Sequence, residues 1–296
     1  MDTPAASIDL HVHTERSEDG EVSPRGVLSL ARKLRLRAIA FSDHDTTAAV
    51  DEGVALAPRF NLDFLPAVEL TSLYRGKDVH ILGYLIDWKD AGLLAVCERT
   101  RASRFEQARK RVAGLQALGF EIDFDRVVEV AAGRPPTSAI LMAVLRENFA
   151  RRRDERLVPY VEGVRSDSPA LNFFLDYFTP GKAVYVPVET IDAAGAIEVI
   201  RAARGLSVLA HPGRLPLELA EAVVRLGMEG IEVYSSNHTS EQEALYRDFA
   251  AENGLIVTAG SDFHGPGRKT APLGGLRKGD MEMVESLRER HSRLFA

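Results

Sequence analysis

The feature that most constrains the fold is a repeated alternation of short apolar runs with helical patterns. The alternation fills the first ninety residues and returns in the last third of the chain. Repeated β-α units of this kind predict a mostly parallel sheet, either open or closed into a barrel. The expected strands are 8–12, 38–42, 64–68, 79–86, 207–210, 231–234 and 255–259, and the expected helices are 24–36, 47–59, 192–204, 217–226 and 241–253.

The ends of several helices can be placed from single residues. Ser23 followed by Pro24 is typical of an N-cap with proline in the first helical position. Gly205, Gly227 and Gly254 follow the last residues of three later helices and are expected to cap them.

The alternation stops between about residues 96 and 180, where a long helical pattern runs from roughly 98 to 118. Residues 96–156 hold 13 Lys and Arg against 9 Asp and Glu, whereas the whole chain has a net charge of -6. We therefore expect a positively charged helical insertion at 96–180, within an acidic body made of 1–95 and 181–296.

Composition excludes several classes of protein. Cys97 is the only cysteine, which excludes an internal disulfide and a cysteine-based zinc site. The negative net charge argues against a protein that coats duplex nucleic acid or binds membranes through basic residues. Apolar runs stay far below the length of a membrane span, and the first residues lack the pattern of a secretory signal. These observations predict a cytoplasmic enzyme.

Histidines and carboxylates gather at the ends of the expected strands. Asp9, His11 and His13 alternate with apolar residues and therefore share one strand face. A lone histidine in an apolar run is usually a core residue, but seven of the eight histidines occupy strands or strand ends, and only His291 does not. We infer that these histidines gather because they form a polynuclear metal site with the carboxylates. Imidazole and carboxylate ligands suit Zn²⁺, Mn²⁺ or Fe²⁺. The other residues of this group are His44, Glu69, His80, His211, Glu232, His238, Asp262 and His264.

Four short motifs resemble those of the polymerase-and-histidinol-phosphatase (PHP) family. They are His11-Val-His13, Ser42-Asp43-His44, His211-Pro212 and Ser261-Asp262-Phe263-His264, in that order along the chain. The resemblance implies an α/β fold, a distorted (β/α)₇ TIM-like barrel with the helical insertion. It also implies a centre of two to three divalent ions (Mn²⁺, Fe²⁺ or Zn²⁺) that hydrolyses phosphoesters.

The resemblance also assigns ligands. The first metal would be held by His11, His13, Glu69 and Asp262; the second by Glu69, as a bridge, with His80 and His211; the third by Asp19, His44 and His264. Glu18 replaces Asp19 if the motif is shifted by one residue. Asp9 and Asp43 are expected behind the ligands, where they would orient imidazoles, and Asp43 thereby belongs to the catalytic machinery.

Further segments are similar to the branch of the family that contains nucleoside 3',5'-bisphosphate phosphatases and RNA-end nucleases. These segments are 230–239, Gly133-Arg134-Pro135 and 181–187. Pro136 stands where that branch has histidine, and the stretch at 151–177 is longer than in compact members.

The resemblance implies hydrolysis of a phosphomonoester of a small nucleotide by metal-activated hydroxide, with short RNA ends as a related substrate. The alternatives are a cyclic-phosphate phosphodiesterase, a histidinol-phosphate phosphatase and a non-catalytic metal-binding module. The oligomeric state stays open.

Residues outside the metal site are expected to bind and protonate the substrate. His238, an imidazole in a loop after a strand, is the candidate general acid. The insertion is expected to cover the active site and to supply cations, because a guanidinium fits a phosphate that is held but not cleaved. The candidate substrate-binding residues are Arg101, Arg104, Arg134, Lys182 and Arg214.

Overall fold

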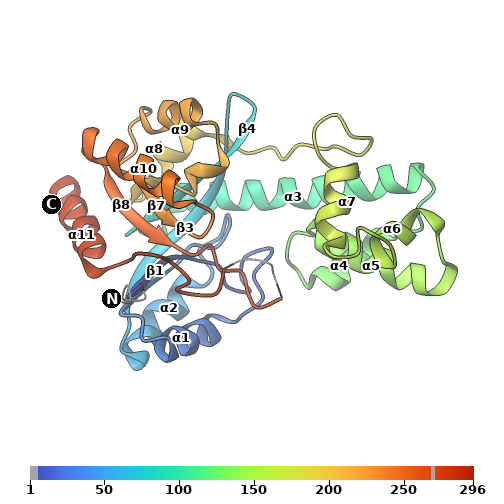
Figure 1. The fold of residues 1–296 in the computed structure, drawn as a ribbon, viewed down its shortest axis with the longest axis horizontal. Helices are drawn as coiled ribbons and strands as arrows, with labels where there is room; N and C mark the ends of the chain where they lie inside the picture. Colours follow the sequence, from blue (N-terminus) through green and yellow to red (C-terminus); the bar gives the residue numbers. More distant parts are fainter. Residues whose placement is uncertain (1–5, 268–270) are drawn as a thin grey trace. The chain divides into compact units, whose positions relative to one another are not determined.

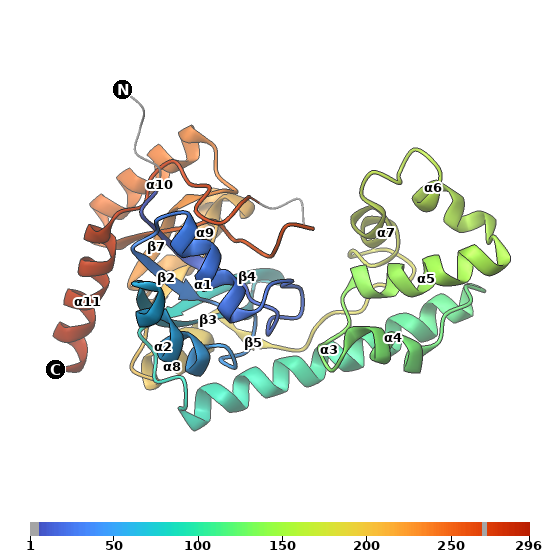
Figure 2. The same ribbon diagram turned by 90° about the horizontal axis from the view of Figure 1, so that it is seen from below.

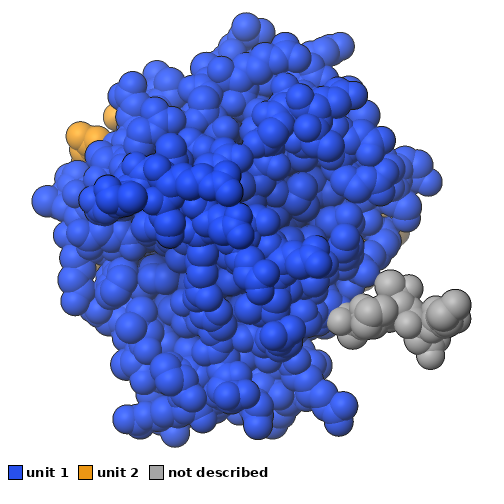
Figure 3. All heavy atoms as spheres, turned by 90° about the vertical axis from the view of Figure 1, so that its left-hand side faces the viewer, with its two compact units in different colours: residues 1–98, 190–296 blue, residues 99–189 orange. Residues whose placement is uncertain are grey.

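The computed structural model describes residues 6–267 and 271–296. These form two compact units, Met1–Glu98 with Thr190–Ala296 and, separately, Arg99–Glu189, which Figure 3 distinguishes by colour. The bounds 96–180 expected for the insertion lie close to those of the second unit. Covering of the active site by the insertion stays a prediction.

The first unit is built around one sheet whose strands follow the path β1-β2-β3-β4-β6-β7-β8, with β5 paired to β3 (Figure 1). The two ends of the path meet, since the Asp262 amide donates to the His11 carbonyl and the His13 amide to the Phe263 carbonyl, both at 2.9 Å. The predicted α/β, TIM-like barrel is thereby confirmed. The strands are β1 (Ile8–Val12), β2 (Ala38–Phe41), β3 (Asp63–Tyr74), β4 (Lys77–Tyr84), β5 (Ile191–Asp192), β6 (Leu206–Leu209), β7 (Gly230–Ser235) and β8 (Ile256–Gly260).

One strand departs from the expected parallel order, because β4 is antiparallel to both β3 and β6. Arg75 and Gly76 join β3 to β4 and have φ angles of 50° and 74°, which is the backbone of a two-residue hairpin turn. This hairpin brings His80 of β4 opposite Thr71 of β3, two residues beyond Glu69.

Helices of the first unit pack around the barrel (Figures 1 and 2). Ser23 accepts a hydrogen bond from the Gly26 amide and Pro24 opens the first helix, as predicted. The helices are α1 (Pro24–Lys33), α2 (Val50–Leu56), η1 (Ala57–Phe60), α8 (Ala193–Ala202), η3 (Pro212–Arg214), α9 (Leu217–Val224), α10 (Ser240–Glu252) and α11 (Met281–Phe295).

One of the expected glycine caps is wrong. Gly227 and Gly254 have positive φ angles, but after α8 it is Arg204 that takes the left-handed conformation, with φ of 58°. A Cβ at Gly205 would lie 2.5 Å from Ile86, so this glycine is needed for a close approach instead.

The second unit is helical and has its own apolar core, in which Phe120, Phe173 and Tyr177 pack ring against ring. Among the described residues, none of the helices combines the length and the hydropathy needed to cross a bilayer. The helix that leads into this unit is α3 (Ala91–Ala117), followed by α4 (Phe124–Ala131), α5 (Ser138–Arg152), η2 (Glu155–Leu157), α6 (Val158–Val161) and α7 (Pro169–Tyr177).

Candidate metal centre

The candidate metal centre is formed where strands of the first unit end. His11 lies in β1 and His13 just beyond it, on the same face because side chains alternate along a strand. Glu69 lies within β3, and the segments after β2, β6 and β8 supply His44, His211 and the pair Asp262 and His264. Nearly all of these side chains are buried, although the strands that hold them are far apart in the sequence.

Glu69 stands at the middle of the cluster, with its two oxygens facing different histidines. Its Oε2 lies 3.2 Å from His11 Nε2, 3.3 Å from His13 Nε2 and 3.0 Å from His44 Nδ1. Its Oε1 lies 3.1 Å from His80 Nδ1 and 3.1 Å from His211 Nε2. A carboxylate placed in this way can bridge two cations.

Asp262 and Asp19 extend the cluster to either side of His13. Asp262 Oδ1 lies 3.4 Å from His11 Nε2 and 3.3 Å from His13 Nε2. Asp19 Oδ2 lies 3.2 Å from His264 Nε2, and the rings of His13 and His264 stack with centroids 4.1 Å apart. Asp19 is thus close to the other ligands that the resemblance assigns to the third metal, and its role as a ligand stays a prediction.

The donor atoms fit divalent ions. Within the described ranges, four buried atoms that face one another have no hydrogen-bond partner, namely His11 Nε2, His13 Nε2, His44 Nδ1 and Glu69 Oε2. Leaving such atoms buried without a partner is costly, and a cation would satisfy all of them at once. Three sets of donor atoms lie within 4.8 Å of one another: His11, His13, Glu69 and Asp262; His44, Glu69 and His80; and His13, Asp19, His44 and His264.

Hydrogen bonds behind the cluster determine which ring nitrogen carries the proton in His11 and His264. His11 Nδ1 lies 2.9 Å from Glu232 Oε1, and a carboxylate oxygen only accepts, so Nδ1 carries the proton and Nε2 is free to bind a metal. His264 Nδ1 likewise donates to the Asp262 carbonyl at 2.7 Å, which leaves its Nε2 facing Asp19.

Glu232 has a second contact that supports the site. Its Oε2 accepts the backbone amide of His211 at 2.8 Å. His211 has φ of 27° and ψ of 58°, a strained conformation that must be held by its surroundings. The sequence placed Glu232 within a strand, in the group of histidines and carboxylates, but assigned it no ligand. A carboxylate between Ile231 and Val233, inside an apolar strand, was the sequence signal that could have indicated a supporting role, and in the structure it is fully buried.

Comparisons with known proteins agree with this geometry. A family model described as PHP domain matches residues 9–149. Over 275 residues the chain is 32% identical to the 3',5'-nucleoside bisphosphate phosphatase of Chromobacterium violaceum, and the match covers 91% of each chain. The chain belongs to the PHP family.

Other PHP-type relatives differ in the reaction that their names give. The phosphoribosyl 1,2-cyclic phosphate 1,2-diphosphodiesterase of Eggerthella lenta is 30% identical over 87% of this chain and 94% of its own. A 5'-3' exoribonuclease of Haemophilus influenzae is 28% identical, and the match covers 87% of this chain and 90% of the relative. A crystal structure from Bifidobacterium adolescentis, assigned as a metal-dependent phosphoesterase, is 29% identical, with a TM-score of 0.79 and 98% of both chains covered. The chain is therefore a metal-dependent phosphatase or phosphodiesterase, which confirms the predicted enzyme class.

Two buried carboxylates bind residues next to the expected ligands. Asp43 accepts from the Thr14 amide at 2.6 Å and the Thr14 hydroxyl at 2.8 Å. Asp9 accepts from the Ser261 amide at 2.9 Å and the Ser261 hydroxyl at 2.6 Å. Both therefore hold the backbone beside His13 and Asp262, and the expectation that they orient imidazoles stays a prediction. Burial raises the pKa of each of these two carboxyl groups to about 6.

His238, the expected general acid of this PHP enzyme, is engaged by backbone on both sides of its ring. Nδ1 lies 2.8 Å from the Val233 carbonyl, so it must donate. Nε2 accepts from the Gly213 amide at 3.0 Å. His238 thus joins two loops of the barrel, and its role as the general acid stays a prediction.

Arg214 lies at the edge of the PHP metal cluster, as expected for a substrate-binding residue. Its guanidinium donates to Asp262 Oδ2 at 2.8 Å and to Asn237 Oδ1 at 3.0 Å, and its side chain is 49% exposed. Asn237, which sequence reasoning missed, also donates to Asp262 Oδ2, at 3.1 Å. Asp262 therefore turns one oxygen to the histidines and the other to Arg214 and Asn237.

The remaining expected substrate-binding residues belong to the second unit, and their role in the PHP reaction stays a prediction. Arg101 and Arg104 lie on α3 and are half-buried. Arg134 follows α4 in a turn that its amide closes with the Ala131 carbonyl, and Lys182 is exposed after α7.

We expect metal binding to this PHP centre to displace a proton from His13. Burial alone would lower the pKa of His13, but the carboxylates of Asp262 and Glu69 raise it to about 10 in the metal-free chain. His13 is then protonated at neutral pH, whereas a metal needs the free lone pair, so affinity for Mn²⁺ should rise as the pH increases from about 7 towards 10. Calorimetric titrations in buffers with different ionisation enthalpies measure the released proton. Mn²⁺ affinity that is independent of pH across this range would contradict the assignment.

Proposed function

We propose that the chain removes a phosphate from a small nucleotide that carries two phosphates, of the 3',5'-bisphosphate type. The observation that carries this proposal is Arg214, a half-exposed guanidinium bound to the outer oxygen of Asp262, next to the donor atoms for metal. A cation in that place can hold a phosphate that is not cleaved. The name of the Chromobacterium violaceum relative supports the same substrate class.

The proposed ligands divide into the sets that the geometry brings together. His11, His13, Glu69 and Asp262 would hold one ion; Glu69 with His80, His211 and the nearby His44 a second; and Asp19, His44 and His264, beside His13, a third. When bound, such ions neutralise phosphoryl oxygens and make water acidic enough to attack phosphorus near neutral pH.

The protein's own residues orient and hold the reacting groups. Glu232 keeps His11 Nε2 directed at the cluster, and His238 fixes Gly213, the residue before Arg214. Arg214 would bind the second phosphate of the nucleotide, and its contact with Asp262 keeps the guanidinium in place before the substrate arrives. The oriented Arg214 therefore favours substrates with two phosphates.

Phosphate release from a panel of substrates with added Mn²⁺ tests the proposal. A nucleoside 3',5'-bisphosphate is expected to be hydrolysed at a higher kcat/KM than the matching monophosphate, a ribose cyclic phosphate, a 5'-phosphorylated oligoribonucleotide or histidinol phosphate. Turnover of the cyclic phosphate with none of the bisphosphate would replace the proposal with a diesterase. Turnover of the oligoribonucleotide alone would replace it with an exonuclease.

A variant makes the test specific to Arg214. Arg214→Gln is expected to lower kcat/KM for the bisphosphate about tenfold or more, mainly through KM, because a charge-assisted hydrogen bond is lost. For the monophosphate the loss should be smaller. Arg225→Gln, which removes an exposed arginine just after the nearby α9, is the matched control. An equal loss on both substrates would argue against a contact with the second phosphate.

A further inference from the structure

A positively charged pocket lies at the end of the barrel away from the metal centre. The hollow measures ≈ 620 Å³, and Leu36, Arg37 and Asp63 lie in its lining where β2 and β3 begin. The segment that includes His44 follows the other end of β2, whose four residues span about 13 Å at roughly 3.3 Å each. A ligand in this pocket therefore does not occupy the metal centre.

Four cations lie in a six-residue stretch beside this pocket. Within the described part of the chain none of them forms an ion pair, and the stretch contains no acidic residue. The one carboxylate of the pocket, that of Asp63, is paired with Arg288 at 2.6 Å. In a chain with a net charge of -6, this is a local reversal of sign that favours an anion. The four cations are Arg32, Lys33, Arg35 and Arg37.

The cations are not needed to cap α1, and the backbone that carries them is fixed. The amides of Leu34, Arg35 and Leu36 bond the carbonyls at the end of that helix, at 2.9 to 3.1 Å. The Arg37 amide donates to Ser7 at 2.6 Å, and the Arg37 carbonyl accepts from Asp63 at 2.8 Å. A binding surface held in this way loses little backbone entropy when a ligand binds.

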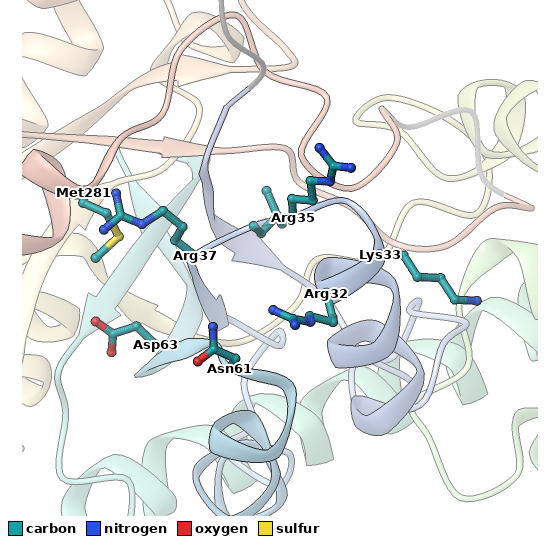
Figure 4. Close-up of a pocket in the computed structure, with 8 residues that line it drawn as sticks. Arg32, Lys33, Arg35, Arg37, Asn61, Asp63 and Met281 are labelled. Carbon is teal, nitrogen blue, oxygen red and sulfur yellow. The ribbon is translucent and has the colours of Figure 1, made fainter.

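Arg32 and Arg37 lie on two different sides of the pocket. Figure 4 shows Arg37 directed toward Met281 and Arg32 directed toward the space above Asn61, whereas Lys33 and Arg35 point outward from the turn. A guanidinium binds phosphate through paired hydrogen bonds and stacks on flat rings. Met281, which is half-buried, adds apolar surface, so the pocket offers contacts for both a phosphate and an aromatic ring.

We propose that this pocket binds a nucleoside phosphate, with Arg32 and Arg37 turning toward the phosphate from two sides of the pocket and the base against Met281. The ligand would be either a free nucleotide or one residue of an RNA strand, since both present the same phosphate and base. This second site does not depend on the function proposed for the metal centre.

Binding to the full chain in the presence of a chelator tests the proposal. AMP is titrated by calorimetry, and a labelled 5'-phosphorylated oligoribonucleotide by fluorescence anisotropy over a range of salt concentrations. Binding should persist without metal and should weaken about tenfold or more in the double variant Arg32→Gln/Arg37→Gln. For RNA the slope of log K against log salt should fall by about 0.7, because the two arginines bind one phosphate and each phosphate contact on a single strand contributes about 0.7. Binding of both AMP and RNA indicates a site for free nucleotides, and binding of RNA alone indicates a site for an RNA strand.

Control variants separate this pocket from general surface charge. Arg225→Gln/Arg293→Gln removes two comparably exposed arginines elsewhere in the unit and should leave binding unchanged. Asp63→Asn should tighten binding, because it removes the negative charge of a lining residue that repels a phosphate. The proposal is overturned if the chelator abolishes binding, if the Arg32/Arg37 variant binds normally, or if poly-L-glutamate competes as well as RNA does.

Discussion

Replacing Glu69 with alanine is expected to abolish phosphate release and to remove more than one divalent ion from each chain. The two oxygens of this carboxylate face separate groups of imidazoles, at 3.0 to 3.3 Å and at 3.1 Å. Loss of the side chain therefore removes a donor that two groups of imidazoles share. In the donor set of His44, Glu69 and His80, it also removes the one negative charge. We expect kcat/KM to fall by at least about 10³-fold, on the scale of losing a main electrostatic group.

Metal analysis after dialysis against Mn²⁺ measures the second part of this prediction. Glu69→Gln keeps the shape of the side chain but removes its charge, and it should lose metal in the same way. Glu243→Gln is the matched control, because Glu243 is also buried but pairs with Arg277 instead of facing the histidines. If Glu69→Ala loses one ion only, Glu69 does not bridge two sites.

A cluster of histidines and carboxylates could be expected from the sequence because part of its geometry is local, whereas the resemblance to the PHP family supplied the assignment of ligands. Alternation along one strand puts His11 and His13 on one face, and the ends of neighbouring strands meet at one rim of a barrel. The antiparallel placement of β4 was missed, although Arg75 and Gly76 form a two-residue turn with positive φ angles. A rhythm of apolar runs indicates where strands lie but not the direction in which each one enters the sheet.

The supporting contacts could not be predicted, because they join residues that only folding brings together. His11 and Glu232 are separated by 221 positions, and Gly213 and His238 by 25. The same limit applies to His238. An imidazole in a loop after a strand suits proton transfer in general, but the sequence does not show that the carbonyl of Val233 and the amide of Gly213 contact its two nitrogens.

Glu232 is the residue outside the donor sets whose replacement should weaken metal binding most. It is fully buried, it orients His11 through Nδ1, and it holds the strained backbone of His211. Loss of a partner that orients a ligand typically lowers metal affinity or activity by about 10- to 100-fold, and we expect this range for Glu232→Ala. The unoccupied amide of His211 should also lower the free energy of unfolding by about 1–3 kcal/mol.

Glu232→Gln separates the two contacts of this carboxylate. The amide oxygen of glutamine can accept from His11 or from His211, but its NH₂ group would face the other donor. The variant should therefore lose one hydrogen bond and fall between the wild type and Glu232→Ala in Mn²⁺ affinity. Nitrogen chemical shifts of His11 in the metal-free chain report whether Nδ1 still carries the proton. A structural defect elsewhere in the chain would not change these shifts. Normal Mn²⁺ affinity in Glu232→Ala, with the fold retained, would show that metal binding does not depend on Glu232.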